Sequence, residues 1–281
     1  MLEWTALPIS FTAMLAALLI HARVRQIFPR DLPSTPRKLH SLPTPLAGIV
    51  PAIGTCAYLT WIGHPYLGAA AALASVLGFL DDLAKQNNAG GPSWKFKAIT
   101  LLIASLILAL GRQQATETAA LDLILVTILI FVITNAVNFL DNTNGVALTI
   151  ACLGLLLSTG GQGPLAAVGY LWLGALPFNW PRSHIFIGDA GALCLGLCLS
   201  AATLDGFHGP QGFDSLAAVA IAGIPLADFA QVVTVRIAIG HPPWVGDQRH
   251  LTHIAMNLGS PRWAVAPLFG AMAAGIYWAL G

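Results

Sequence analysis

The sequence predicts an all-α integral membrane protein of about ten transmembrane helices. Hydrophobic residues make up 56% of its 281 residues, charged residues only 9%, and the mean hydropathy is +0.74. Soluble domains carry roughly 25% charged residues, so this composition belongs to a membrane protein. No stretch shows the two-residue alternation of a membrane barrel strand. The whole chain, residues 1–281, is interpreted as a single polytopic membrane domain.

Ten apolar runs approach the roughly 20 residues that a helix needs to cross a bilayer. They cover residues 4–21, 46–62, 66–80, 98–111, 121–139, 145–159, 164–178, 186–204, 215–235 and 263–280. Of the 13 lysines and arginines, all except Arg112 lie in or beside the first, third, fifth, seventh and ninth loops. The positive-inside rule makes these loops cytoplasmic and places both termini on the extracytoplasmic side.

Six aspartates from five different segments fall on the same predicted cytoplasmic face. They are Asp81, Asp82, Asp141, Asp189, Asp228 and Asp247. Acids near the hydrocarbon boundary are costly and usually functional. Their common location predicts one polar active-site cleft that opens at the cytoplasmic face.

The stretch GFLDDLAK ends the third apolar run. Asp81 and Asp82 lie four and three residues before Lys85, so all three side chains can share a helix face. A solvated helix end with an ion pair remains the alternative to a functional site.

The stretch NAVNFLDNTNG ends the fifth run. Asn135, Asn138 and Asp141 or Asn142 recur at spacings of three and four, which places them on one helix face. Asn144 and the glycine that follows it favour a turn. Hydrogen bonds between helices explain one or two such asparagines, but not four together with an aspartate.

Two further stretches carry chemistry on this face. In FIGDAGAL, Asp189 stands between two glycines before an apolar helix, which fits a helix cap or a Mg²⁺ ligand equally well. In GDQRHLTH, residues 246–253, Arg249, His250 and His253 favour an anionic ligand over zinc, because the His-Glu-x-x-His pattern is absent. A solvated interfacial loop is the alternative there.

The stretch PLADFAQVVTVR places Asp228 and Arg236 eight residues apart on one helix face. A buried structural pair and a role in the site are both open. With Lys95 and Lys97 nearby, the acids, amides and histidines together indicate Mg²⁺-assisted handling of a diphosphate. The lipid chain of such a substrate would remain in the bilayer.

These motifs resemble, in order, those of the polyprenyl-phosphate N-acetylhexosamine-1-phosphate transferases, and the resemblance covers nearly the whole chain. RKLHSLPTPLAG (37–48) is similar to that family's first cytoplasmic loop, and GFLDDLAK with GPSWKFK (91–97) to its Asp-Asp motif and downstream lysine. NAVNFLDNTNG resembles its Asn-x-x-Asn-x-x-Asp signature, FIGDAG its metal-binding motif and DQRHLTH its histidine loop.

The resemblance implies a role for each matching residue. The catalytic group is expected to comprise Asp81, Asp82, Lys97 and Asp141. Asn138 and Asp189 are the expected metal ligands, for Mg²⁺ or alternatively Mn²⁺. The expected substrate-binding residues are Lys85, Asn135, Asn142, Asn144, Arg249, His250 and His253.

The implied reaction is attack by undecaprenyl phosphate on the β-phosphorus of a UDP-N-acetylhexosamine, with release of UMP. It would be the first membrane step of cell-envelope glycan synthesis, carried out in a bacterial inner membrane. The partners are the two substrates and the lipid bilayer, with no nucleic acid, and a homodimer is left open.

Departures from the family pattern bear on the sugar donor. Asn144 stands where bacterial members often carry a second aspartate, and Ile254-Ala255 follow the histidine loop instead of an aromatic residue and an acid. The simpler histidine loop favours UDP-N-acetylglucosamine over the donor of a phospho-N-acetylmuramoyl-pentapeptide transferase, which is the alternative. A polytopic transporter is the alternative outside the class, but it would place ionisable residues near mid-membrane in repeated halves.

Overall fold

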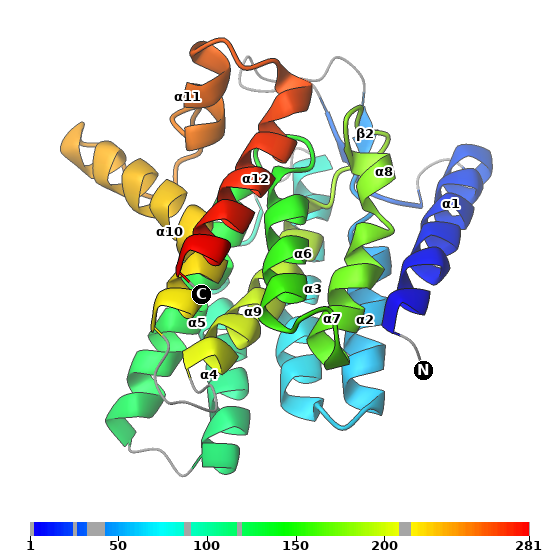
Figure 1. The fold of residues 1–281 in the computed structure, drawn as a ribbon. Coiled ribbons are helices and arrows are strands. Elements are labelled where there is room, and N and C mark those ends of the chain that lie inside the picture. The colour runs from blue at the N-terminus through cyan, green and yellow to red at the C-terminus, as the bar shows by residue number, and fades with distance from the viewer. Residues whose placement is uncertain are drawn as a thin grey trace.

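A computed structural model describes residues 3–24, 27–32, 43–86, 91–116, 120–207 and 215–280 (Figure 1). Within these ranges the chain is helical except for one two-stranded antiparallel sheet and the connecting turns. The first half contains η1 Glu3–Thr5, α1 Ala6–Val24, β1 Arg30–Asp31, β2 Thr44–Pro45, α2 Ile49–Trp61, α3 Pro65–Gln86, α4 Trp94–Thr116 and α5 Ala120–Leu140. The second half contains α6 Val146–Ser158, α7 Gly163–Leu173, α8 Leu176–Asn179, α9 Gly188–Phe207, α10 Ser215–Ala238, α11 Leu251–Asn257 and α12 Arg262–Leu280. The all-α prediction is confirmed for the described residues.

Each of the ten apolar runs contains a helix. Among the described residues, five helical stretches are long and apolar enough to cross a membrane: Pro65–Gln86, Trp94–Gln113, Asp122–Leu140, Ala220–Ala238 and Arg262–Leu280. Their length and composition support a multi-pass membrane protein. The count of ten crossings and the sidedness of the termini stay predictions.

The run 164–178 was expected as one helix but is divided into α7 and α8. Gly174 lies so close to α1 that an added Cβ would stand 2.7 Å from the carbonyl oxygen of Leu7. Pro177 then occupies the first turn of α8, a position where proline is tolerated because its missing N–H has no helical partner. The helix therefore ends at Leu173 and restarts at Leu176.

Helix α9 forms the centre of the bundle. It packs against α2, α3, α5, α6, α7 and α10. Every residue from Ala192 to Leu204 is buried, including small residues that allow close helix contact. The first turn of α9, which carries Asp189, is therefore held by helices from both halves of the chain.

The outer faces of α4 and α5 are apolar. Ile99 and Ile103 on α4 are 60% and 48% exposed, and Ile124 and Ile128 on α5 are 57% and 50% exposed. A broad exposed apolar surface is expected where helices face lipid. These two helices lie together at one end of the view in Figure 1, away from α1.

The short sheet and a neighbouring bridge lie against the start of α9. β1 pairs antiparallel with β2, and Leu46 forms a parallel bridge with Phe186. Gly48 is required here, because a Cβ at this position would overlap the backbone of Ile187. The second half of the predicted first-loop motif thus borders the FIGDAG turn, while residues 37–42 lie outside the described residues.

Candidate functional site

Three aspartates and two lysines meet where the C-terminal end of α3, the start of α4 and the start of α9 come together. Lys85 Nζ lies 2.8 Å from Asp189 Oδ1, 3.1 Å from Asp81 Oδ2 and 3.8 Å from Asp82 Oδ1. Lys97 Nζ lies 2.6 Å from Asp81 Oδ1. The structure therefore joins five of the predicted site residues, which we call the acid–lysine cluster: Asp81, Asp82, Lys85, Lys97 and Asp189.

The cluster has buried acids and accessible lysines. The side chains of Asp81 and Asp82 are 5% and 2% exposed, whereas those of Lys85 and Lys97 are 45% and 38% exposed. Aspartates held beneath lysines fix the ammonium groups in place. The outward ammonium groups can then bind a second anion such as a phosphate, because each has three donors.

Asp82 caps helix α9. Its Oδ1 accepts a hydrogen bond from the backbone N–H of Asp189 at 3.1 Å, and its Oδ2 accepts one from Ala190 at 3.3 Å. A carboxylate at a helix N-terminus satisfies free N–H groups and is favoured by the helix dipole. Both oxygens of Asp82 are therefore used to hold the turn that carries Asp189.

Two glycines permit this contact between α3 and α9. Gly188 has φ of +62°, and a Cβ there would lie 2.5 Å from Asp82 Oδ2. A Cβ on Gly78 would overlap the backbone of Asp189 and Ala190. The glycine before Asp189 in the sequence is thus explained by the cap.

The asparagine-rich stretch forms the end of α5 and the turn before α6. Asn135 Nδ2 donates to the carbonyl of Phe131 at 2.8 Å, and Asn142 Nδ2 donates to that of Phe139 at 2.9 Å. Asn144 Oδ1 accepts from Arg262 Nη2 at 3.2 Å. Three of the predicted substrate-binding amides thus have partners within the protein, which fix the shape of the turn.

Asn138 and Asp141 differ from these three. Neither side chain has a hydrogen-bond or ion-pair partner among the described residues, and both are partly exposed. Burial and the nearby charge of Asp189 together raise the pKa of Asp141 to about 7, against the opposing charge of Lys85. Asp141 therefore lies within electrostatic range of the acid–lysine cluster.

The histidine loop is held by Asp228 of α10. His250 Nδ1 lies 2.7 Å from Asp228 Oδ2, and the backbone N–H of Leu251 donates to Asp228 Oδ1 at 2.6 Å. Within α11 the Thr252 hydroxyl donates to Asn142 Oδ1, which connects the histidine loop to the α5–α6 turn. The histidine loop and the asparagine-rich stretch, which are far apart in the sequence, are thus in contact.

His250 comes just before α11 and His253 lies within it, with ring centroids 5.9 Å apart. Burial and the nearby charge of His250 lower the pKa of His253. His250 and His253 are only 5% and 8% exposed, so their rings are fixed by packing. The prediction that the two histidines lie together is confirmed.

Asp228 and Arg236 do not form the pair that their spacing allows. Arg236 instead makes a double hydrogen bond to Asp247, with Nε–Oδ2 at 3.0 Å and Nη2–Oδ1 at 3.2 Å, while Asp228 binds His250. Burial raises the pKa of Asp247, but the hydrogen bonds from Arg236 and Arg249 outweigh it and hold this pKa well below its usual value. Arg249 Nη1 lies 2.8 Å from Asp247 Oδ2, and the Arg249 side chain is 42% exposed.

Sequence reasoning missed an aromatic contact that joins α4 to the loop after α10. The rings of Trp94 and Trp244 are stacked with centroids 4.4 Å apart, and the Lys95 ammonium lies 5.8 Å from the Trp94 ring centroid. Each tryptophan precedes a charged member of the site by three residues, namely Lys97 and Asp247. This shared position, three residues before a charged residue of the site, was the only hint in the sequence that the two tryptophans lie near the site.

The donor set suits a hard divalent cation that keeps most of its coordination for water and phosphate. Among the described residues no three His, Cys, Asp or Glu side chains are arranged so that they could hold a metal ion together. Mg²⁺ commonly uses only one or two protein carboxylates beside substrate phosphates. The partly exposed carboxylate of Asp189 and the unpartnered oxygens of Asn138 and Asp141 fit that pattern.

This chain is similar in sequence to several known transferases. The decaprenyl-phosphate N-acetylglucosaminephosphotransferase of Mycobacterium tuberculosis is 26% identical over 319 residues, covering 91% of this chain and 75% of that protein. Undecaprenyl-phosphate alpha-N-acetylglucosaminyl 1-phosphate transferases of Thermotoga maritima and Escherichia coli are each 27% identical. These alignments cover 64% and 44% of this chain, and 57% and 38% of the two relatives.

The family model for glycosyl transferase family 4 matches residues 64–207, from the start of α3 to the end of α9. The matched region includes the whole acid–lysine cluster and the asparagine-rich turn. Because it covers just over half of the sequence, this chain belongs to glycosyl transferase family 4.

Proposed function

We propose that this protein transfers N-acetylglucosamine 1-phosphate from UDP-N-acetylglucosamine to undecaprenyl phosphate and releases UMP. The observation that carries the proposal is the acid–lysine cluster, in which two accessible ammonium groups are fixed by buried aspartates beside Asp189. The relatives named as polyprenyl-phosphate N-acetylglucosamine-1-phosphate transferases support it. The twelve basic residues on one predicted face support a cytoplasmic site in a bacterial inner membrane.

In this reaction a phosphate oxygen of the lipid attacks the β-phosphorus of the nucleotide sugar. The bond from that phosphorus to the oxygen bridging the two phosphates breaks, and UMP leaves with the bridging oxygen. Lys85 and Lys97 would hold the phosphates in line and offset their charge, which is the main requirement of phosphoryl transfer. A phosphate monoester has its second pKa near ~6, so the lipid phosphate needs little help in losing its proton.

The remaining residues would position the substrates. Asp189 and Asn138 would hold Mg²⁺. The bound ion would neutralise charge on the diphosphate. Asp81 orients Lys97 through their ion pair. Arg249 is accessible at the edge of the histidine loop and can bind a diphosphate oxygen or the sugar.

The proposal is tested with the purified full-length protein, undecaprenyl phosphate, Mg²⁺ and a panel of UDP-sugars, by measuring UMP release. We expect release with UDP-N-acetylglucosamine and near-complete loss in Asp189→Ala and Lys97→Ala. Tyr277→Phe is a matched control, because it removes a hydroxyl near the C-terminal end of α12 that donates to the Leu157 carbonyl. Absence of release with every sugar, or full release in Asp189→Ala, would overturn the proposal.

A further inference from the structure

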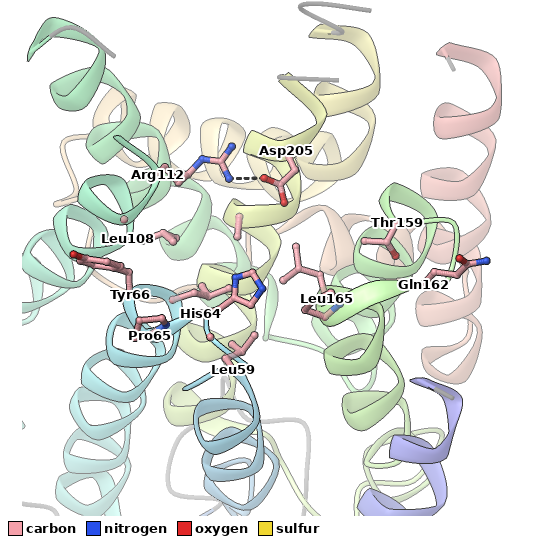
Figure 2. Close-up of a pocket in the computed structure, with 15 residues that line it drawn as sticks. Leu59, His64, Pro65, Tyr66, Leu108, Arg112, Thr159, Gln162, Leu165 and Asp205 are labelled. Carbon is pink, nitrogen blue, oxygen red and sulfur yellow. Dashed lines mark hydrogen bonds and ion pairs between the residues drawn. The ribbon is translucent and has the colours of Figure 1, made fainter. Parts of the chain in front are cut away.

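A cavity of about 580 Å³ lies at the opposite end of α3, α4 and α9 from the acid–lysine cluster (Figure 2). It is formed by the α2–α3 turn, the start of α3, the last turns of α4 and α9, and the turn between α6 and α7. Tyr66 borders it and Asp81 belongs to the cluster, so about 22 Å of helix α3 separates the two. The cavity is therefore separate from the acid–lysine cluster.

Opposite charges stand together at one side of this cavity. Arg112 of α4 and Asp205 of α9 form an ion pair, with Nη1–Oδ1 at 2.5 Å, and their side chains are 20% and 58% exposed. Figure 2 shows the pair spanning the two helix ends above His64. Arg112 is also the one basic residue that the sequence pattern places on the extracytoplasmic side.

Two further polar residues, His64 and Gln162, line the cavity. No hydrogen bond engages the side chains of His64 and Gln162 within the part of the chain that is described, and both residues are exposed. An imidazole and an amide can each donate to a phosphate or glycerol oxygen. In Figure 2, His64 lies near the middle of the view and Gln162 at its right-hand edge.

The rest of the wall is apolar. Leu59, Leu67, Leu108, Leu165 and Ala201 line it, and the ring of Tyr66 forms one edge. Gly111 is needed for that edge, because a Cβ at this position would overlap the Tyr66 side chain. The cavity thus combines an apolar wall with a rim that carries one positive and one negative charge.

We propose that this cavity binds a phospholipid with a primary-amine headgroup. The lipid phosphate faces Arg112, the ammonium group faces Asp205, and the first part of an acyl chain lies on the leucine wall. This headgroup matches the rim in charge, since it carries one anion and one primary ammonium that donates hydrogen bonds. A free multivalent anion fits less well, because Asp205 already offsets Arg112 and the apolar wall would stay empty.

Headgroup chemistry discriminates between lipids. A trimethylated ammonium keeps the charge but cannot donate a hydrogen bond to Asp205, and a glycerol headgroup lacks the positive charge. We therefore expect phosphatidylethanolamine to bind most tightly, phosphatidylcholine less tightly and phosphatidylglycerol least. Because a ligand that binds the folded state stabilises it, each affinity also appears as a rise in melting temperature.

The test uses the delipidated full-length protein in detergent, with binding of each lipid measured by native mass spectrometry and by thermal shift. A parallel measurement with inorganic phosphate alone distinguishes a site for lipid from a site for any phosphate anion. We expect at least a tenfold loss of phosphatidylethanolamine binding in Arg112→Gln and Asp205→Asn. Ile128→Ala, on the lipid-facing surface of α5, should bind as the wild type does.

Helical content and elution volume establish that each variant is folded. Gln162→Leu is a second, milder variant at an exposed turn, and we expect a severalfold loss from it. Equal affinity for the three lipids, a thermal shift of the same size with inorganic phosphate, or full binding by Arg112→Gln and Asp205→Asn would each overturn the proposal. UMP release is not used here, so failure of the transferase assay would leave this test intact.

Discussion

The carboxylate of Asp82 on α3 caps the helix turn that carries Asp189 on α9. Its two oxygens accept from the backbone N–H groups of Asp189 at 3.1 Å and Ala190 at 3.3 Å. Asp81, its neighbour, points instead to Lys97 and Lys85. Adjacent aspartates of one motif thus have different partners and, we infer, different tasks.

Asp82→Asn should lower stability and activity together. The amide keeps one acceptor but loses the second and the negative charge, so we expect a loss of about 1 kcal/mol. In a chain of this size that corresponds to a fall of roughly 2–4 °C in melting temperature. Asp81→Asn is the matched comparison: it should reduce turnover with a smaller thermal change, because Asp81 caps no helix and its side chain contacts Lys85, Lys97 and Asp189. Equal melting temperatures for the two variants would contradict the assignment.

Gly188→Ala tests the approach of α3 to α9. The alanine would adopt φ of +62° and place its Cβ 2.5 Å from Asp82 Oδ2. Gly160→Ala is a matched control, because Gly160 has φ of +59° and no atom within 4 Å of the added Cβ. We expect the control to cost about 1 kcal/mol from backbone strain alone. The Gly188 variant should lose clearly more stability and most activity; similar losses in both would mean that the close approach is unimportant.

Asp141 predicts a pH-dependent requirement for Mg²⁺. Its pKa is raised to about 7, first by burial and then by the charge of Asp189, so the carboxyl is mostly protonated at pH 6 and mostly ionised at pH 8. An ionised second acid beside Asp189 strengthens cation binding. The Mg²⁺ concentration for half-maximal UMP release should therefore fall as the pH rises from 6 to 8.

Asp141→Asn supplies the control for this titration, because its side chain remains neutral throughout. Its Mg²⁺ requirement should be higher than that of the wild type at pH 8 and should change little between pH 6 and 8. A variant that keeps the full pH dependence would assign the titration to another group.

The sequence predicted what depends on local geometry. Spacings of three and four residues placed Asp81, Asp82 and Lys85 on one face, and the structure brings them together. The ten apolar runs each contain a helix because hydropathy is a local property. Helix α11 was not predicted, since seven residues are too few to show a helical period, and the break before α8 depends on a contact with α1.

Contacts between distant segments could not be predicted in this way. The cap by Asp82 requires knowledge of how α3 meets α9, and no spacing within either helix encodes it. The spacing of eight residues between Asp228 and Arg236 suggested a pair. The chain instead reverses after α10, so that His250 binds Asp228 and Asp247 binds Arg236. The metal ligands remain a prediction from residue chemistry and family resemblance.

Thr252→Val should loosen the connection between the histidine loop and the α5–α6 turn. The change keeps the shape of the side chain and removes the hydroxyl that donates to Asn142 Oδ1. One such hydrogen bond is worth about 1 kcal/mol, or roughly a fivefold change in an equilibrium. We expect a rise of that size in KM for the UDP-sugar. Thr252→Ser should retain the wild-type KM, and Thr203→Val controls for losing a buried hydroxyl that donates to Leu199 of its own helix.

Asp247→Asn should release Arg249 and the start of the histidine loop. Arg236 is 2% exposed and its guanidinium depends on Asp247 for a double hydrogen bond, so removing the carboxylate leaves a buried charge without its partner. Breaking a buried pair of this kind costs about 3 kcal/mol. We expect a lower melting temperature and a higher KM for the UDP-sugar.

The double variant Arg236→Met with Asp247→Leu separates charge burial from loop positioning. It removes both charges, so it should recover much of the stability that Asp247→Asn loses. Its KM should stay high, because Arg249 Nη1 and the backbone N–H of Arg249 both bind Asp247 in the wild type. Thermal unfolding and UMP release measured on the same preparations decide this. Recovery of a wild-type KM in the double variant would show that Asp247 serves stability alone.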